Sequence, residues 1–165
     1  MSVNTNEAVV VFDKESLIND DLHFTNHINY LCRTDEKQKW TNGATKYNGA
    51  FLFDYNHEYL AHYKFDSIEN INKVRNEISK FSSVYDVKDL RMLRLSWEHE
   101  DNEVSLNQMP RDISQLIMDF AKCPFIEPIA IVVHLDQNDH YPHCHFLYKG
   151  SGFEEYCYKE VSDNL

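Results

Sequence analysis

Two apolar, β-branched runs, residues 129–135 and 143–149, constrain the fold of this chain more than any other feature. Each run is typical of a buried strand, and the polar stretch between them contains a proline, so together they predict a β-hairpin. Side chains alternate between the two faces of a strand. His134 and Asp136 therefore share one face, and His143 and His145 share one face.

The histidines of this hairpin predict a metal site. In one allowed antiparallel register, with the turn around residues 137–142, His134 lies opposite His145 and Asp136 lies opposite His143. Directly opposed Cβ atoms are roughly 4.5–5.5 Å apart, which lets three imidazoles share one cation. Two histidines two positions apart are weak evidence by themselves. The third histidine and the nearby carboxylate make a ligand set the better interpretation.

The spacing of these residues excludes several metal families. Histidine-triad nucleotide hydrolases need a histidine at three alternating positions, but Leu147 follows His145 in that series. The helical HExxH motif of zincins is absent, and Lys149 and Gly150 stand where a cupin would carry a glutamate. Three histidines with open coordination positions are typical of a catalytic site. Imidazoles suit Mn²⁺, Zn²⁺, Ni²⁺ or Co²⁺, and Mg²⁺ fits when substrate phosphates supply oxygens.

The composition is that of an ordinary globular protein. The 165 residues are 42% hydrophobic and 13% aromatic, which is enough for one domain with its own core. No apolar run approaches the roughly 20 residues of a membrane span, and the N-terminus lacks a basic region, so we expect a cytoplasmic protein with no membrane partner. The four cysteines show no CxxC spacing. Cys144 alternates away from the histidines and is most simply a core residue.

The formal net charge of −11 argues against a protein that coats DNA non-specifically, because that affinity comes from neutralised phosphates. The charge is uneven, however. Residues 30–50 hold basic side chains interleaved with aromatic ones, and such a strip can bind a short single strand even on an acidic domain. A solvated helix end and loop would have the same composition, so both interpretations stay open. The candidate nucleic-acid contacts are Arg33, Lys37, Lys39 and Trp40.

Hydrophobic periodicity predicts the remaining elements. Besides the hairpin, strands are expected at residues 8–12, 50–53 and 90–97, and helices at residues 24–33, 67–81 and 110–122. Thr25 and Ser67 are the expected N-caps of the first two helices. This order predicts an α+β two-layer sandwich with a largely antiparallel sheet of about five strands, with the metal site on two central adjacent strands. We expect one domain over residues 1–150 and an acidic, aromatic tail over residues 151–165.

Three segments follow one another in an order typical of one enzyme family. His143-Cys-His145, with His134-Leu-Asp136 upstream, resembles the third motif of plasmid relaxases, which belong to the His-hydrophobic-His ("HUH") single-strand endonucleases. Residues 26–36 resemble the first relaxase motif, which carries a nucleophilic tyrosine. Residues 94–100 resemble the second, in which a serine at a strand end contacts DNA near the scissile phosphate. Together the three segments span most of the chain from about residue 24 to residue 149.

The resemblance implies a metal-dependent enzyme that nicks single-stranded DNA at an origin of transfer and then transfers the strand. The three histidines would hold the metal, which polarises the scissile phosphate. Tyr30 would attack this phosphate, giving a 5′-phosphotyrosyl adduct and a free 3′-OH. Ser96 would contact the DNA, and Asp136 would orient a ligand imidazole or activate the tyrosine. The implied partners are single-stranded DNA at the nick site and accessory relaxosome proteins.

Other interpretations stay open. Tyr141, in the loop beside the metal, is the rival nucleophile, and Tyr47 is a third candidate. The same chemistry serves rolling-circle replication initiators and transposases, which this sequence does not separate from relaxases. A further class is a relaxase-derived DNA-binding or regulatory module without catalysis, or an unrelated metal-dependent enzyme. Packing at a strand end explains Ser96 equally well, and a solvated helix face is the commoner explanation for Arg33 and Lys37.

Overall fold

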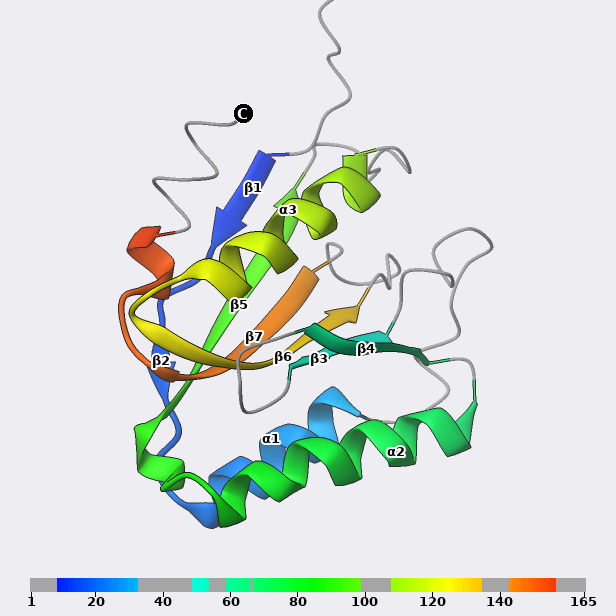
Figure 1. The fold of residues 1–165 in the computed structure, drawn as a ribbon, viewed down its shortest axis with the longest axis vertical. Helices are drawn as coiled ribbons and strands as arrows, with labels where there is room; N and C mark the ends of the chain where they lie inside the picture. Colours follow the sequence, from blue (N-terminus) through cyan, green and yellow to red (C-terminus); the bar gives the residue numbers. More distant parts are fainter. Residues whose placement is uncertain are drawn as a thin grey trace, which may run out of the picture.

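A computed structural model describes residues 9–32, 49–53, 59–65, 67–98, 108–134 and 143–156. These residues form a seven-stranded sheet with the order β1-β5-β7-β6-β3-β4, and the short β2 also pairs with β5 (Figure 1). All the pairings between these strands are antiparallel. The strands are β1 (Val9–Phe12), β2 (Ser16–Leu17), β3 (Gly49–Phe53), β4 (Tyr59–Lys64), β5 (Leu90–Glu98), β6 (Ile126–His134) and β7 (His143–Gly150).

Helices cover both faces of the sheet. α1 (Asp21–Leu31) and α2 (Ile68–Ser79) lie on one face, and α3 (Gln108–Lys122) lies on the other (Figure 1). Two 3-10 turns, η3 (Lys80–Ser83) and η4 (Val87–Asp89), connect α2 to β5. No helix within the described residues is long and apolar enough to cross a membrane.

The α+β class and the antiparallel sheet are confirmed, and β6 and β7 are the two middle strands as expected. The two-layer sandwich of about five strands was wrong: the molecule has a helical layer on each face and a larger sheet. The middle strands are buried on both faces, so each face needs its own cover. β2 was missed because it has only two residues, and β4 because its sequence, YLAHYK, mixes polar and apolar side chains.

The first core lies between the sheet and α3. Phe120 of α3 is at its centre, with ring centroids 5.2 Å from Phe53 and Phe146, 6.0 Å from Tyr148 and 4.9 Å from Phe153. Side chains of β7 that point away from the histidines, including Cys144, belong to this core. Phe153, which lies in the expected C-terminal tail, is fully buried here.

The second core lies between the opposite face of the sheet and the helices α1 and α2. The expected apolar stripes of both helices are buried in it: Phe24, Ile28 and Leu31 from α1, and Ile71, Val74 and Ile78 from α2. Val132 and Leu147 of the middle strands pack against them. Val132 is two positions from His134, and Leu147 is two positions from His145, so each pair points to the same face of the sheet. The histidines therefore lie on the face that α1 and α2 cover.

The helix starts follow the capping chemistry of the sequence. Ser67 caps α2 as expected, since its Oγ accepts a hydrogen bond of 3.1 Å from the backbone N–H of Asn70. The expected cap of α1 at Thr25 was wrong, because the helix begins one turn earlier. Asp20 is the N-cap and accepts a bond of 2.8 Å from the N–H of His23, and Asp21 follows in the first turn. Both carboxylates favour the positive end of the helix dipole.

Candidate metal centre

The candidate metal centre lies where β6 ends and β7 begins. His134 is directly opposite His143 in the register of the two strands, and Val132 is opposite His145. The expected register, with His134 opposite His145, was therefore wrong by two residues. An even shift keeps every side chain on its original face, so the three histidines still share one face. Asp136, expected opposite His143, lies outside the described residues.

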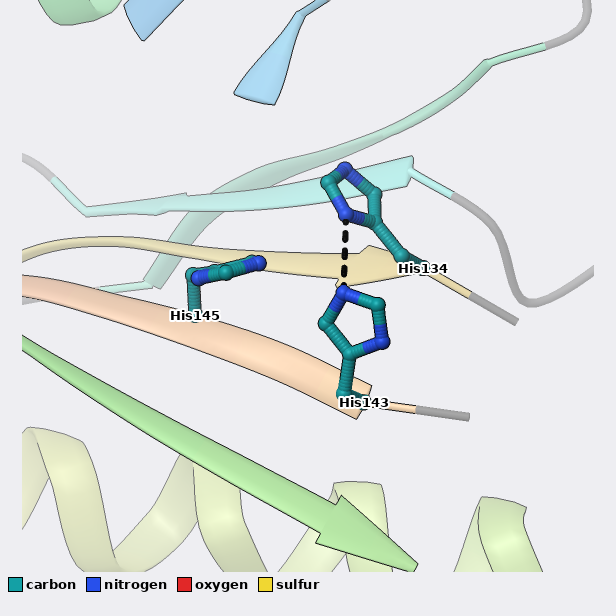
Figure 2. A group of neighbouring side chains, drawn as sticks. All are labelled: His134, His143 and His145. Atoms are coloured by element: carbon teal, nitrogen blue, oxygen red, sulfur yellow. Dashed lines mark hydrogen bonds between the residues drawn. The ribbon is translucent and has the colours of Figure 1, made fainter. Parts of the chain in front are cut away.

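The three imidazoles point toward one another (Figure 2). Their ring centroids are 5.2 Å apart for His134 and His143, 5.2 Å for His134 and His145, and 5.0 Å for His143 and His145. One ring nitrogen from each residue lies within 4.8 Å of the others, a spacing suited to one metal ion. We call these three residues the histidine triad. Their exposed fractions are only 1%, 4% and 8%, so the site is shielded from bulk water.

A backbone carbonyl at the end of α1 fixes the tautomer of His134. The Nε2 of His134 lies 3.0 Å from the carbonyl oxygen of Leu31, and a carbonyl can only accept, so Nε2 carries the proton. The Nδ1 of His134 is therefore unprotonated, and it forms a hydrogen bond of 3.4 Å with the Nε2 of His143 (Figure 2). Outer hydrogen bonds of this kind orient metal-binding imidazoles in proteins. Nδ1 is thus the atom of His134 that can bind a metal.

The electrostatics of His145 also favour a metal. Burial lowers the pKa of His145 well below its usual value, and the neighbouring imidazoles of His134 and His143 lower it further. The ring is therefore neutral at pH 7, as a ligand must be. Among the described residues, the Nε2 of His145 has no hydrogen-bond partner although it is buried. A buried nitrogen without a partner is uncommon in proteins, and a bound metal ion would supply that partner. The triad therefore fits a divalent metal.

The last turns of α1 bring two further side chains to the triad. The Tyr30 ring centroid is 6.3 Å from that of His145, and the Tyr30 side chain is 46% exposed. His27, one turn earlier, has its ring centroid 6.0 Å from His145. Burial and nearby His23 lower the pKa of His27 to about 4, and its buried Nε2 has no hydrogen-bond partner within the described part of the chain. His27 was missed, although its spacing of three from Tyr30 puts both on one helix face.

β5 brings further polar side chains alongside β7. Ser96 lies opposite His143 and is buried, and its Oγ donates a hydrogen bond of 3.2 Å to the Oε2 of Glu98. The predicted Ser96 thus lies beside the triad. Arg94, opposite His145, and Glu98 were given no role, although alternation along the strand puts residues 94, 96 and 98 on one face. That these residues neighbour the triad depends on the pairing of β5 with β7.

The remaining site residues that the sequence predicts have no described position relative to the triad. Arg33, Lys37, Lys39, Trp40, Tyr47, Asp136 and Tyr141 lie outside the described residues. The nucleic-acid contacts and the rival nucleophiles in the loops therefore stay predictions from the sequence.

Comparison with known proteins adds no relative: no protein-family model, curated protein or solved structure matches this chain. The functional argument therefore depends on the motifs of the sequence and on the geometry of the triad.

A side chain of α2, Arg75, also binds the C-terminal end of α1. Nη2 of Arg75 donates a hydrogen bond of 2.7 Å to the carbonyl oxygen of Cys32, and its Nη1 donates one of 2.8 Å to Asn72. The carbonyls of Leu31 and Cys32, which the helix itself leaves unpaired, are therefore bonded by His134 of β6 and Arg75 of α2. A guanidinium at this end also complements the negative end of the helix dipole. Arg75 thus fixes the turn that carries Tyr30.

We expect the substitution Arg75→Met to lower the free energy of unfolding by about 1–3 kcal/mol, because a charged hydrogen bond to a buried carbonyl is lost. Urea denaturation would measure the change. Lys73→Met is the matched control on the same helix. The Lys73 ammonium lies over the Tyr63 ring at 5.0 Å, a contact worth about 0.5–1 kcal/mol. Equal losses in the two variants would contradict the role given to Arg75.

Proposed function

We propose that this protein is a metal-dependent enzyme that nicks single-stranded DNA and forms a covalent tyrosyl–DNA intermediate at an origin of transfer, as relaxases do. The observation that carries the proposal is the position of Tyr30 on α1, with its ring 6.3 Å from that of His145 in the histidine triad. A partly exposed tyrosine beside a buried three-imidazole site is the pairing that a nucleophile and a phosphate-activating metal require.

The residues of the site would share the chemistry as follows. His134, His143 and His145 hold the metal, which when bound neutralises charge that develops on the phosphate. The Tyr30 oxygen attacks phosphorus, the bond from phosphorus to the 3′ oxygen breaks, and the hydroxyl proton of the tyrosine ends on that oxygen. The products are a 5′-phosphotyrosine and a free 3′-OH. Since one phosphate ester replaces another, the reverse step can rejoin a strand.

An adduct assay tests this proposal. The protein is incubated with Mn²⁺ and a labelled pool of single-stranded oligonucleotides, and covalent protein–DNA adducts are resolved on a denaturing gel. We expect an adduct with the wild type and none with Tyr30→Phe, which removes only the hydroxyl. Tyr85→Phe is the matched control, because Tyr85 stacks on Phe81 away from the triad; it should form the adduct as the wild type does.

The same assay distinguishes the alternatives. If no oligonucleotide pool gives an adduct with folded, Mn²⁺-loaded protein, the nuclease proposal fails and a non-catalytic module becomes the better explanation. An adduct that persists in Tyr30→Phe and disappears in Tyr141→Phe would assign the nucleophile to the loop. Persistence in Tyr30→Phe with loss in His27→Gln would assign it to His27, since imidazoles also form covalent intermediates and this one lies 6.0 Å from His145.

A further inference from the structure

A permanent positive charge lies directly beside the histidine triad. Arg94 of β5 is opposite His145 of β7 in the register of the two strands. Leu93 and Leu95 point into the core beneath α3, so Arg94 points to the other face, which carries the triad. Directly opposed residues have Cβ atoms roughly 4.5–5.5 Å apart.

The ion pair of Arg94 is weak. Its Nη1 lies 3.4 Å from Oδ2 of Asp13, and the side chains of the two residues are 38% and 52% exposed. Exposed ion pairs of this kind contribute little to stability and exchange easily with solvent. The guanidinium can therefore leave Asp13 for a stronger anion at small cost.

A guanidinium in this position weakens the binding of a metal cation when no other ligand is present. Metal-binding imidazoles are usually backed by carbonyls or carboxylates, as His134 is by the carbonyl of Leu31. Arg94 stays charged at every physiological pH, and two like charges at this range repel each other. An anion that lies between the guanidinium and the metal attracts both cations, and these attractions outweigh the repulsion between them.

We propose that Arg94 is a phosphate-binding residue that grips a substrate phosphate together with the metal held by the histidine triad. This inference rests on the proposed function and extends it from the metal to the phosphate. The planar fork of an arginine matches two phosphate oxygens at once, and such charge-assisted pairs are among the strong hydrogen bonds in proteins. Arg94 stabilises the charge of the bound phosphate from the β5 side, while Tyr30 approaches from α1.

Another arginine on the same strand provides a matched control. Arg91 lies three positions before Arg94 and so points to the opposite face of β5. Its Nη1 is 3.8 Å from Oε1 of Glu15, whose other carboxylate oxygen accepts a hydrogen bond from the Tyr148 hydroxyl. Arg91 therefore has the same charge and strand as Arg94 but a structural partner away from the triad.

The test measures binding of two simple probes in the whole protein. Mn²⁺ affinity is measured first, from the signal of the free ion in electron paramagnetic resonance. Inorganic phosphate is then titrated onto the Mn²⁺-loaded protein by calorimetry. In Arg94→Gln we expect phosphate affinity to fall at least ~10-fold and Mn²⁺ affinity to rise about 2- to 10-fold, because a like charge is gone. Arg94→Lys should recover part of the phosphate affinity, and Arg91→Gln should change neither value.

The opposite signs of the two changes separate phosphate binding from a structural role. A structural role would lower both affinities together, and that result overturns the assignment, as does unchanged phosphate affinity in Arg94→Gln. If the wild type binds Mn²⁺ but not phosphate, the assignment also fails while the metal site stands. If the wild type binds no Mn²⁺, the proposed metal-dependent function and this assignment fail together.

Discussion

Replacing His145 with asparagine is expected to abolish the stabilisation of this protein by divalent metal. A ligand that binds only the folded state stabilises it by about 2.7 kcal/mol when present at 100 times its Kd. His145 supplies one of the three nitrogens that lie within 4.8 Å of one another, so its loss leaves only two ligands from the triad. Urea denaturation of EDTA-treated protein, with and without added Mn²⁺, would measure the difference. We expect the full increase in the wild type and almost none in His145→Asn.

His62→Asn is the control for this experiment. His62 is also a partly buried histidine in the sheet, and within the described residues its Nε2 has no hydrogen-bond partner. It stacks on Phe51, with ring centroids 4.2 Å apart, on the α3 side of the sheet rather than beside the triad. The His62 variant should keep the full response to Mn²⁺. A response that survives in His145→Asn, or disappears equally in both variants, would show that the triad is not the metal site.

The second large effect is expected in the core beneath α3. Phe120→Ala should lower the free energy of unfolding by about 3–5 kcal/mol, the usual range for a buried phenylalanine. Phe120 is fully buried and packs against rings from β3, β7 and the segment after β7. Truncation therefore leaves a cavity that rigid strands on the other side cannot close. Urea denaturation would measure the loss.

Met118→Ala is the control on the same helix. Met118 is 48% exposed, so its truncation should change stability by no more than about 0.5 kcal/mol. Phe120→Leu should keep most of the stability and also the full response to Mn²⁺, because the triad lies on the opposite face of the sheet. Comparable losses in Phe120→Ala and Met118→Ala would contradict the aromatic core described above.

Alternation along the hairpin strands, together with an assumed antiparallel register, put the three histidines on one face. Periodicity was enough to identify the buried stripes of α1 and α2. The register of the hairpin was not predictable in the same way. Shifts of two residues leave every side chain on its face, so the pattern allows His134 to lie opposite either His145 or His143. The strand pairing decides between them: β6 ends at His134, which lies opposite His143.

The second helical layer was missed although a signal was present. Residues 129–133 of β6 are uninterrupted apolar residues, and a strand of this kind is buried on both faces. An alternating strand would have needed only one cover. The apolar side chains of α3, Ile113, Leu116 and Phe120, provide the second cover. Phe153 adds to it from a segment that composition alone describes as an acidic tail.

The sequence by itself determined which side chains share a face or a helix stripe, because those periodicities are properties of the local backbone. On this basis alone His143 can be grouped with His145, and His27 with Tyr30. His134 joins the first pair through the pairing of β6 with β7. Only the tertiary structure decided that α1 lies over the triad and that Arg94 and Ser96 stand beside His145 and His143. Strand order, register and helix placement depend on pairing and burial between segments far apart in the chain, which no local pattern encodes.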